Sequence, residues 1–318
     1  MPRLWSHLDF SKSNANVKLQ AVRKYVKLAK GNVTQTTFDS FGASPERVPR
    51  YITTRCKHLE KMVLPAGLLT ASILDSAPCA PKLKTLILLS QCHTTIDAVN
   101  QLLQHCHGLE RAEFHSVASR SGSSVLHMDN LPNLQSLTLR CRMPPKGAPD
   151  CRRLKLSGGF FDTPNLTMLS LTDWFFHPNT FGVPPPPPDF STLQKLEDLD
   201  ISGMLSTLPP VLPSSLRTLD MSRCGFGNST LFVSPNLPLL TRLAIADISR
   251  TTFNGPTLDP LRAMLLSNKG NLTHLDASGV IMQSEIEQLL MEGYLGNVEV
   301  CTLPRAISPQ LDFNLRRC

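Results

Sequence analysis

Two clusters of cysteine and histidine are the first residues in this sequence that could do chemistry. Cys92 precedes His93, and His105, Cys106 and His107 stand in a row. Thiolate and imidazole are zinc ligands, but structural zinc sites usually show tighter paired spacing. Cys106 stands three residues before a leucine-rich strand pattern, as Cys56 does, so a buried structural thiol explains it. We therefore expect no metal ion and no other cofactor.

Motifs for catalysis are missing from the sequence. It contains no G-x-S-x-G or H-E-x-x-H pattern and no glycine loop that could bind a phosphate. No nucleophile stands in a pattern with a base. We predict a protein that is not an enzyme and has no catalytic residues.

Aspartates form a recurring pattern that could bind a ligand. The sequence Leu-Asp-Φ-Ser, where Φ is a small or apolar residue, recurs at Leu199, Leu219 and Leu275. Neighbouring strands lie about 4.8 Å apart, so Asp200 and Asp220 would be close neighbours in a stacked sheet. A bound cation would relieve their repulsion. The pattern predicts an acidic stripe that favours a basic peptide; alternatively, the aspartates cap neighbouring backbone or hydroxyl groups.

A repeated strand motif must position these side chains. The spacing L-x-x-L-x-L, or an apolar variant of it, recurs along the chain, in most cases with a step of about 24–26 residues. Leucine-rich repeats of about 20–29 residues have this period and this strand core. The motif starts at Trp5, Val33, Leu59, Leu83, Leu109, Leu134, Cys151, Leu166, Leu196, Leu216, Leu240, Leu272 and Val298.

Helical patterns lie between some of the strands. The segment from Val17 to Lys30 carries an apolar stripe and is followed by Gly31, which suits a helix end. Apolar residues spaced three to four apart predict a second helix after Ile96. The steps around Cys151 and Leu166 are too short for a helix, so we expect bare turns there.

These elements predict an α/β fold: a leucine-rich-repeat solenoid shaped as a horseshoe arc. Its parallel sheet would be concave, with short helices or turns on the convex side. Residues 1–304 would form one solenoid with an irregular loop at 173–195, which contains five consecutive prolines. Residues 305–318 would be a tail or cap.

Outward residues of the concave strands are the expected contacts for a protein partner. They are Asp198, Asp200, Ser202, Asp220, Ser222, His274, Asp276, Arg111, Glu113 and Arg140. Trp174, Phe175 and Phe176 follow a strand and could anchor an interface from a loop. Alternatively, these aromatic residues fill space left by an irregular repeat.

The charge is uneven along the chain. The net charge is +7, and residues 1–60 hold eleven Lys and Arg against four Asp and Glu, which is +7 by itself. This is either the solvated outer face of a helix or a patch for an acidic protein. Nucleic-acid binding is disfavoured because no aromatic residues interleave with the lysines.

The sequence also predicts an intracellular location. It has no apolar run of the roughly 20 residues that a membrane span needs, and no secretory signal, so we expect no membrane contact. Nine scattered cysteines are then simplest as reduced thiols in the cytoplasm or nucleus.

The opening LWSHLDFS, at residues 4–11, is followed by a Lys- and Arg-rich helix and Gly31. This segment resembles the one that follows the F-box in fungal F-box/leucine-rich-repeat proteins. The Cys-x-x-Leu and Leu-Asp-x-Ser patterns resemble their repeat domain. The resemblance implies the substrate-recognition part of a cullin-RING ubiquitin ligase subunit. No F-box precedes Leu4, so a Skp-type adaptor is expected only if an F-box lies upstream. The alternative is a stand-alone leucine-rich-repeat scaffold or regulatory protein without a ligase link.

Overall fold

The computed structural model divides the chain into two compact units, unit 1 (Met1–Leu166) and unit 2 (Thr167–Cys318). The structure describes residues 6–11, 18–38, 47–65, 82–89, 94–118, 124–128, 131–141, 154–156, 163–176, 187–206, 208–226, 237–247, 265, 268, 270–278 and 297–302. None of the helices within these ranges is long and apolar enough to cross a membrane.

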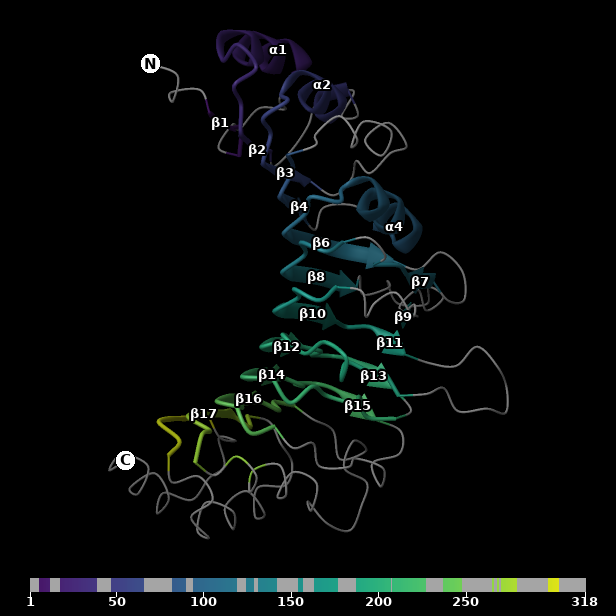
Figure 1. Ribbon diagram of the computed structural model, residues 1–318, viewed down its shortest axis with the longest axis vertical. Coiled ribbons are helices and arrows are strands. Elements are labelled where there is room, and N and C mark those ends of the chain that lie inside the picture. Colours follow the sequence, from purple (N-terminus) through teal and green to yellow (C-terminus); the bar gives the residue numbers. More distant parts are fainter. Residues whose placement is uncertain are drawn as a thin grey trace. The chain divides into compact units, whose positions relative to one another are not determined.

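Unit 1 is built on a ladder of parallel strands (Figure 1). Each strand pairs with the strand of the next repeat, and the short β5 lies beside β6. The strands are β1 (His7–Asp9), β2 (Gln35–Thr37), β3 (Lys61–Pro65), β4 (Thr85–Leu89), β5 (Thr94–Thr95), β6 (Arg111–Ala118) and β8 (Ser136–Cys141).

In-register pairing places equivalent leucine-motif residues beside one another inside unit 1. Because side chains alternate along a strand, the residues between them face outward. One buried row consists of Leu8, Thr36, Met62, Leu86, Ala112 and Leu137. A second buried row consists of Phe38, Leu64, Leu88, Phe114 and Leu139. These rows form the core against which the return segments pack.

Within the described residues of unit 1, three helices form return segments. The predicted first helix is α1 (Leu19–Leu28), which buries Val22 and Val26; Gly31 follows it in the left-handed conformation at φ +74°. The helix predicted after Ile96 is α4 (Ile96–His105), and the Thr95 hydroxyl accepts a hydrogen bond from the Ala98 amide at 3.3 Å. Between them in sequence lies α2 (Arg47–Arg55), which the sequence analysis did not anticipate.

The prediction that the motif at Cys151 forms a strand of the large parallel sheet was wrong. Its strand, β9 (Leu154–Leu156), pairs instead with β7 (Ser124–Leu126) in a separate two-stranded sheet. Two apolar residues at alternate positions suit any strand that is buried on one face, so the spacing alone does not identify the sheet. The short step at this point is therefore not a shortened repeat.

Unit 2 carries the same motif on parallel strands. Two buried rows again lie on the inner face, one of Leu169, Leu199, Leu219, Leu243 and Leu275, the other of Leu171, Ile201, Met221, Ile245 and Ala277. The strands are β10 (Met168–Thr172), β12 (Asp198–Asp200), β14 (Thr218–Asp220), β16 (Arg242–Ala244), β17 (His274–Asp276) and β18 (Val300–Thr302).

Short strands replace helices on the return side of three unit 2 repeats. Here β11 (Phe175–Phe176), β13 (Leu205–Ser206) and β15 (Gly225–Phe226) form a small parallel sheet (Figure 1). Trp174, Met204 and Cys224 occupy equivalent positions just before these strands and are buried. Phe175 and Phe176, which the sequence placed in an irregular loop at 173–195, thus form an ordered strand.

Both units confirm the predicted α/β leucine-rich-repeat solenoid. Each has parallel strands on one side, with helices, turns or short strands on the return. The grouping of residues 1–304 into one domain stays a prediction. Residues 305–318 and Pro184–Pro186 of the proline run lie outside the described residues.

Thr36 is a weak point in the buried rows, and it supplies the first prediction. It is fully buried where other repeats place an apolar residue, and its hydroxyl has no hydrogen-bond partner in the structure. An unsatisfied buried hydroxyl destabilises by about 1–3 kcal/mol. We expect Thr36→Val to raise the free energy of unfolding by about 1 kcal/mol in urea titrations.

Thr53 provides the matched control. It is also buried, but its hydroxyl donates to the Pro49 carbonyl at 3.1 Å. Thr53→Val should leave stability unchanged or lower it. A loss of stability in Thr36→Val as large as that in Thr53→Val would contradict the unpaired state of the Thr36 hydroxyl.

Candidate functional site

The outward side chains of the unit 2 sheet form two rows, which we call the unit 2 outer face. One row runs Met168, Asp198, Thr218, Arg242, His274 and Val300; the other runs Ser170, Asp200, Asp220, Ala244, Asp276 and Thr302. The two rows contain four carboxylates and one guanidinium. The predicted proximity of Asp200 and Asp220 is confirmed, because they are direct partners in adjacent strands.

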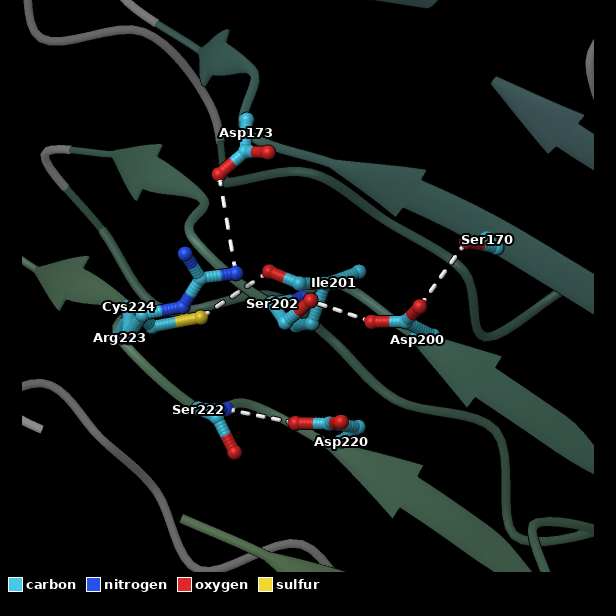
Figure 2. Close-up of polar contacts among 9 residues, drawn as sticks. All are labelled: Ser170, Asp173, Asp200, Ile201, Ser202, Asp220, Ser222, Arg223 and Cys224. Carbon is cyan, nitrogen blue, oxygen red and sulfur yellow. Dashed lines mark hydrogen bonds and ion pairs between the residues drawn. The ribbon is translucent and has the colours of Figure 1, made fainter. Parts of the chain in front are cut away.

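The aspartates of this face also hold the backbone at the strand ends. Oδ1 of Asp200 accepts a hydrogen bond from the Ser202 amide at 3.0 Å, and Oδ1 of Asp220 accepts one from the Ser222 amide at 2.8 Å (Figure 2). Asp276 makes the same bond to the Ser278 amide at 3.0 Å. These are Asx turns, in which a side chain binds the backbone two residues on. The capping alternative is therefore present in the structure.

Capping leaves the charge of these carboxylates in place. Asp200, Asp220 and Asp276 are each half-buried and face outward from the sheet. The second oxygen of Asp200 accepts a hydrogen bond from the Ser170 hydroxyl at 3.0 Å (Figure 2). Like charges directly opposite each other in a sheet are destabilising. Asp200, Asp220 and Asp276, which we call the acidic row, thus hold the strand ends and also keep their negative charge on this face.

A groove lies where the acidic row is interrupted. Ala244 stands between Asp220 and Asp276, and its methyl group leaves a hollow of about 250 Å³. Arg242 and His274 line the groove beside Ala244. Asp220 on β14 and Asp276 on β17 thus border the hollow from the two strands that flank β16.

Left-handed residues fix the turns that follow these strands. Asp173, Gly203 and Arg223 have φ values of +64°, +71° and +59° at equivalent positions. The amide of each donates to a carbonyl of the next repeat, as from Gly203 to Ser222 at 2.7 Å. A Cβ at Gly203 would clash with the Asp173 carboxylate, which also lies 3.9 Å from an Arg223 nitrogen (Figure 2). Contacts between neighbouring repeats therefore fix the backbone turn at the end of each of these strands.

The serines of the predicted site have mainly structural roles. Ser202 is only 8% exposed, and its amide is held by Asp200. The Ser222 hydroxyl accepts a hydrogen bond from the Ala246 amide at 3.2 Å. The structure therefore offers the aspartates, and not Ser202, as accessible polar groups of the stripe, whereas Ser222 is half-buried and its hydroxyl is engaged by the backbone.

The predicted site residues of unit 1 belong to β6 and β8. Arg111 forms an ion pair with Glu113, and His115 lies 3.4 Å from the other oxygen of Glu113. Arg140 is exposed on β8. Because Arg111 neutralises Glu113 along the same strand, this part of unit 1 is less strongly charged than the unit 2 outer face.

The aromatic residues expected on a loop belong to ordered structure. Trp174 is fully buried and Phe176 is 7% exposed, while Phe175 is half-buried. Phe175 and Phe176 form β11, which pairs with β13. This geometry matches the alternative in which these residues fill an irregular repeat. Contact with a partner stays a prediction, with Phe175 the most accessible of the three.

Four of the five described cysteines are buried core residues, and Cys301 is half-buried. The Cys224 thiol donates to the Ile201 carbonyl at 3.1 Å (Figure 2). Burial raises the pKa of Cys106 to about 12 and that of Cys56 to about 11. Both thiols are therefore protonated at neutral pH and are poor nucleophiles.

The histidines beside Cys106 do not join it in a ligand set. His105 and His107 are exposed, whereas Cys106 is buried. Within the described ranges, no three His, Cys, Asp or Glu side chains gather as metal ligands would. Cys92 and His93 lie outside those ranges.

Two substitutions of Asp220 distinguish the contribution of its hydrogen bond in the turn from that of its charge. Asp220→Ala removes the acceptor of the Ser222 amide, so we expect the free energy of unfolding to fall by about 1 kcal/mol. Asp220→Asn keeps an oxygen at that place, so its loss should be less than half as large. Asp198→Ala, in the neighbouring row, is the control and should change stability by less than about 0.5 kcal/mol. Equal losses in the two Asp220 variants would show that the charge, and not the turn, stabilises the strand end.

The buried Cys106 thiol predicts a loss of stability at high pH. Its pKa is raised from 9.0 to about 12 in the folded chain, so the thiolate favours the unfolded chain. The stabilising contribution is complete below pH 9.0 and is lost as the pH rises toward 12. Under reducing conditions, we expect the free energy of unfolding to fall less steeply above pH 9.0 in Cys106→Ala than in the parent chain. The difference is at most about 1.4 kcal/mol per pH unit. Parallel slopes would contradict the buried neutral thiol.

Known proteins share little sequence with this chain. No protein-family model matches the chain, and no curated protein matches it significantly. A solved leucine-rich-repeat protein of Leptospira interrogans is similar at 15% identity, over 87% of this chain and 74% of its own, with a TM-score of 0.38. InlP of Listeria monocytogenes is similar at 13% identity, over 82% of this chain and 58% of its own, with a TM-score of 0.38. The leucine-rich-repeat domain of APL1 is similar at 15% identity, over 72% of this chain and 67% of its own, with a TM-score of 0.34.

Proposed function

We propose that this chain is a non-catalytic protein-binding module whose unit 2 outer face takes a basic segment of its partner. The observation that carries this proposal is the paired row of Asp200 and Asp220 on adjacent strands. Four carboxylates against one guanidinium make the face complementary to a cationic segment. Charge complementarity of this kind steers association and favours the correct partner.

The groove at Ala244 supports an extended, cationic partner. Its volume of about 250 Å³ is below the range of about 300–1,000 Å³ that is usual for small-molecule sites. Asp220 and Asp276 lie on either side of Ala244, about two strand spacings or 9.6 Å apart. The aliphatic part of a lysine or arginine side chain could lie against Leu219, Leu243 and Leu275 in the hollow, with its charged end at one of the two carboxylates.

The finer proposal concerns the assembly in which the module works. By resemblance, the chain is the substrate-recognition part of an F-box-type subunit of a cullin-RING ubiquitin ligase, in the cytoplasm or nucleus. An F-box would be needed for a Skp-type adaptor to bind. The second candidate is a stand-alone leucine-rich-repeat scaffold or regulatory protein. An in-frame F-box exon upstream of Met1, with co-purification of the adaptor, distinguishes the first from the second.

Charge removal from the acidic row tests the binding proposal. A displayed library of random peptides is selected on the intact chain, and we expect Lys and Arg to be enriched among the bound sequences. Asp200→Asn combined with Asp220→Asn keeps both turn oxygens but removes two charges. This variant should weaken the selected peptides at least about fivefold, as measured by fluorescence anisotropy at low salt.

Asp97→Asn combined with Asp189→Asn is the matched control. Asp97 lies in the first turn of α4. Asp189 accepts a hydrogen bond from the Ser191 amide at 2.9 Å. Neither residue belongs to the acidic row. This control removes the same charge and should change affinity less than about twofold. Equal weakening in the two variants, or selection of peptides without basic residues, would overturn the acidic row as the binding site.

A further inference from the structure

Unit 1 carries a basic surface on two neighbouring helices, which we call the α1–α2 basic surface. Its residues are Lys24 and Lys27 of α1 and Arg47, Arg50 and Arg55 of α2, and all five are exposed. The helices lie side by side at one end of unit 1 (Figure 1). The Arg23 guanidinium lies over the Tyr51 ring, 5.6 Å from its centroid, and joins the two helices.

Nothing in the described part of unit 1 neutralises this charge. None of the five side chains forms an ion pair among the described residues. Neither helix has an acidic residue in its first turn, and Lys18 begins α1 without a side-chain cap. Arg47, at the N-terminal end of α2, opposes the helix dipole, whereas Lys27 and Arg55 lie in last turns, where basic residues are favourable. The charge of Arg47 is thus a departure from local stability rules, which is expected at functional sites.

An exposed leucine lies within the same surface. Leu28 is 51% exposed and stands one helical turn from Lys24, so the two side chains share one face of α1. A solvated helix face needs only polar residues at this position. An apolar side chain between lysines suits a partner that offers both carboxylates and apolar groups.

The surrounding aromatic rings are already engaged within unit 1. Tyr25 packs edge-on against Phe10 at 6.0 Å between centroids, and Tyr51 lies beneath Arg23. Each ring therefore already has a partner within unit 1, which reduces the ring surface left for stacking against a nucleic-acid base. Phosphate groups would also leave the Leu28 side chain exposed. These features favour a polypeptide over a nucleic acid.

We propose that the α1–α2 basic surface docks an acidic protein segment that carries apolar residues, with Leu28 as the apolar contact. The surface lies on return helices of unit 1, whereas the proposed basic partner meets strands of unit 2. The two sites have opposite charge and are independent of each other. If the binding test of one site fails, the proposal for the other site is unaffected.

Three labelled probes test this surface on the full chain. The first is a glutamate-rich peptide that contains leucines, the second has serines in place of those leucines, and the third is a short DNA duplex. Binding is measured by fluorescence anisotropy at low salt. We expect the leucine-containing peptide to bind most tightly. Lys24→Gln with Lys27→Gln and Arg50→Gln should weaken it at least about fivefold.

Two further variants separate docking from net charge. Lys84→Gln with Lys195→Gln and Arg217→Gln removes the same charge from exposed positions outside both proposed sites, and should change affinity less than about twofold. Leu28→Gln should weaken the leucine-containing peptide while leaving the serine-containing peptide unchanged. Circular dichroism confirms that each variant is folded.

Several outcomes would overturn the proposal. They are equal weakening in the two triple variants, no effect of Leu28→Gln, no measurable binding of either peptide, and tighter binding of the DNA duplex than of both peptides. The last result would assign the surface to nucleic acid.

Discussion

In-register pairing of parallel strands is the constraint on which every other feature depends. Each leucine motif places its apolar residues beside those of the next repeat, as Leu199 lies beside Leu219. A shift of one residue would turn the whole buried row to the solvent, so burial fixes the register strongly. The same register aligns the outward side chains. The neighbouring positions of Asp200 and Asp220 are therefore a consequence of core packing.

The return segments adapt to this register in different ways. In unit 1 they are mainly helices, and α4 buries Val99 and Leu102. In three repeats of unit 2 they are two-residue strands, and Trp174 fills the space before the first of them. Because only the strand motif must match its neighbours, the residues between strands can vary in length and type.

The sequence predicts the ladder well because its signal is local. Alternation within L-x-x-L-x-L places a strand to within a residue or two, and Gly31 correctly ends the first helix. The errors arise where local signals are shared. The Cys151 pattern has the right spacing but pairs outside the main sheet, since pairing depends on distant residues. The α2 helix was missed because Pro49 and two threonines weaken its helical pattern.

The candidate site was predictable in part for the same reason. The repeated Leu-Asp-Φ-Ser motif was sufficient to place Asp200 beside Asp220. The groove was missed because it depends on the small side chain of Ala244, where neighbouring repeats have aspartate. The signal was present in the sequence, where Leu243-Ala244-Ile245 replaces the Leu-Asp-Φ of other repeats. The burial of Trp174 and Phe176 depends on the small return-side sheet, which no short pattern indicates.

The Asx turn has an evolutionary consequence. Because the turn needs an oxygen and not a charge, asparagine can replace aspartate at any of these strand ends and still hold the amide two residues on. Single substitutions of this kind would change the electrostatic potential of the face in unit steps while the backbone stays the same. Descendants of this chain could therefore exchange one ligand for another without first passing through a misfolded intermediate.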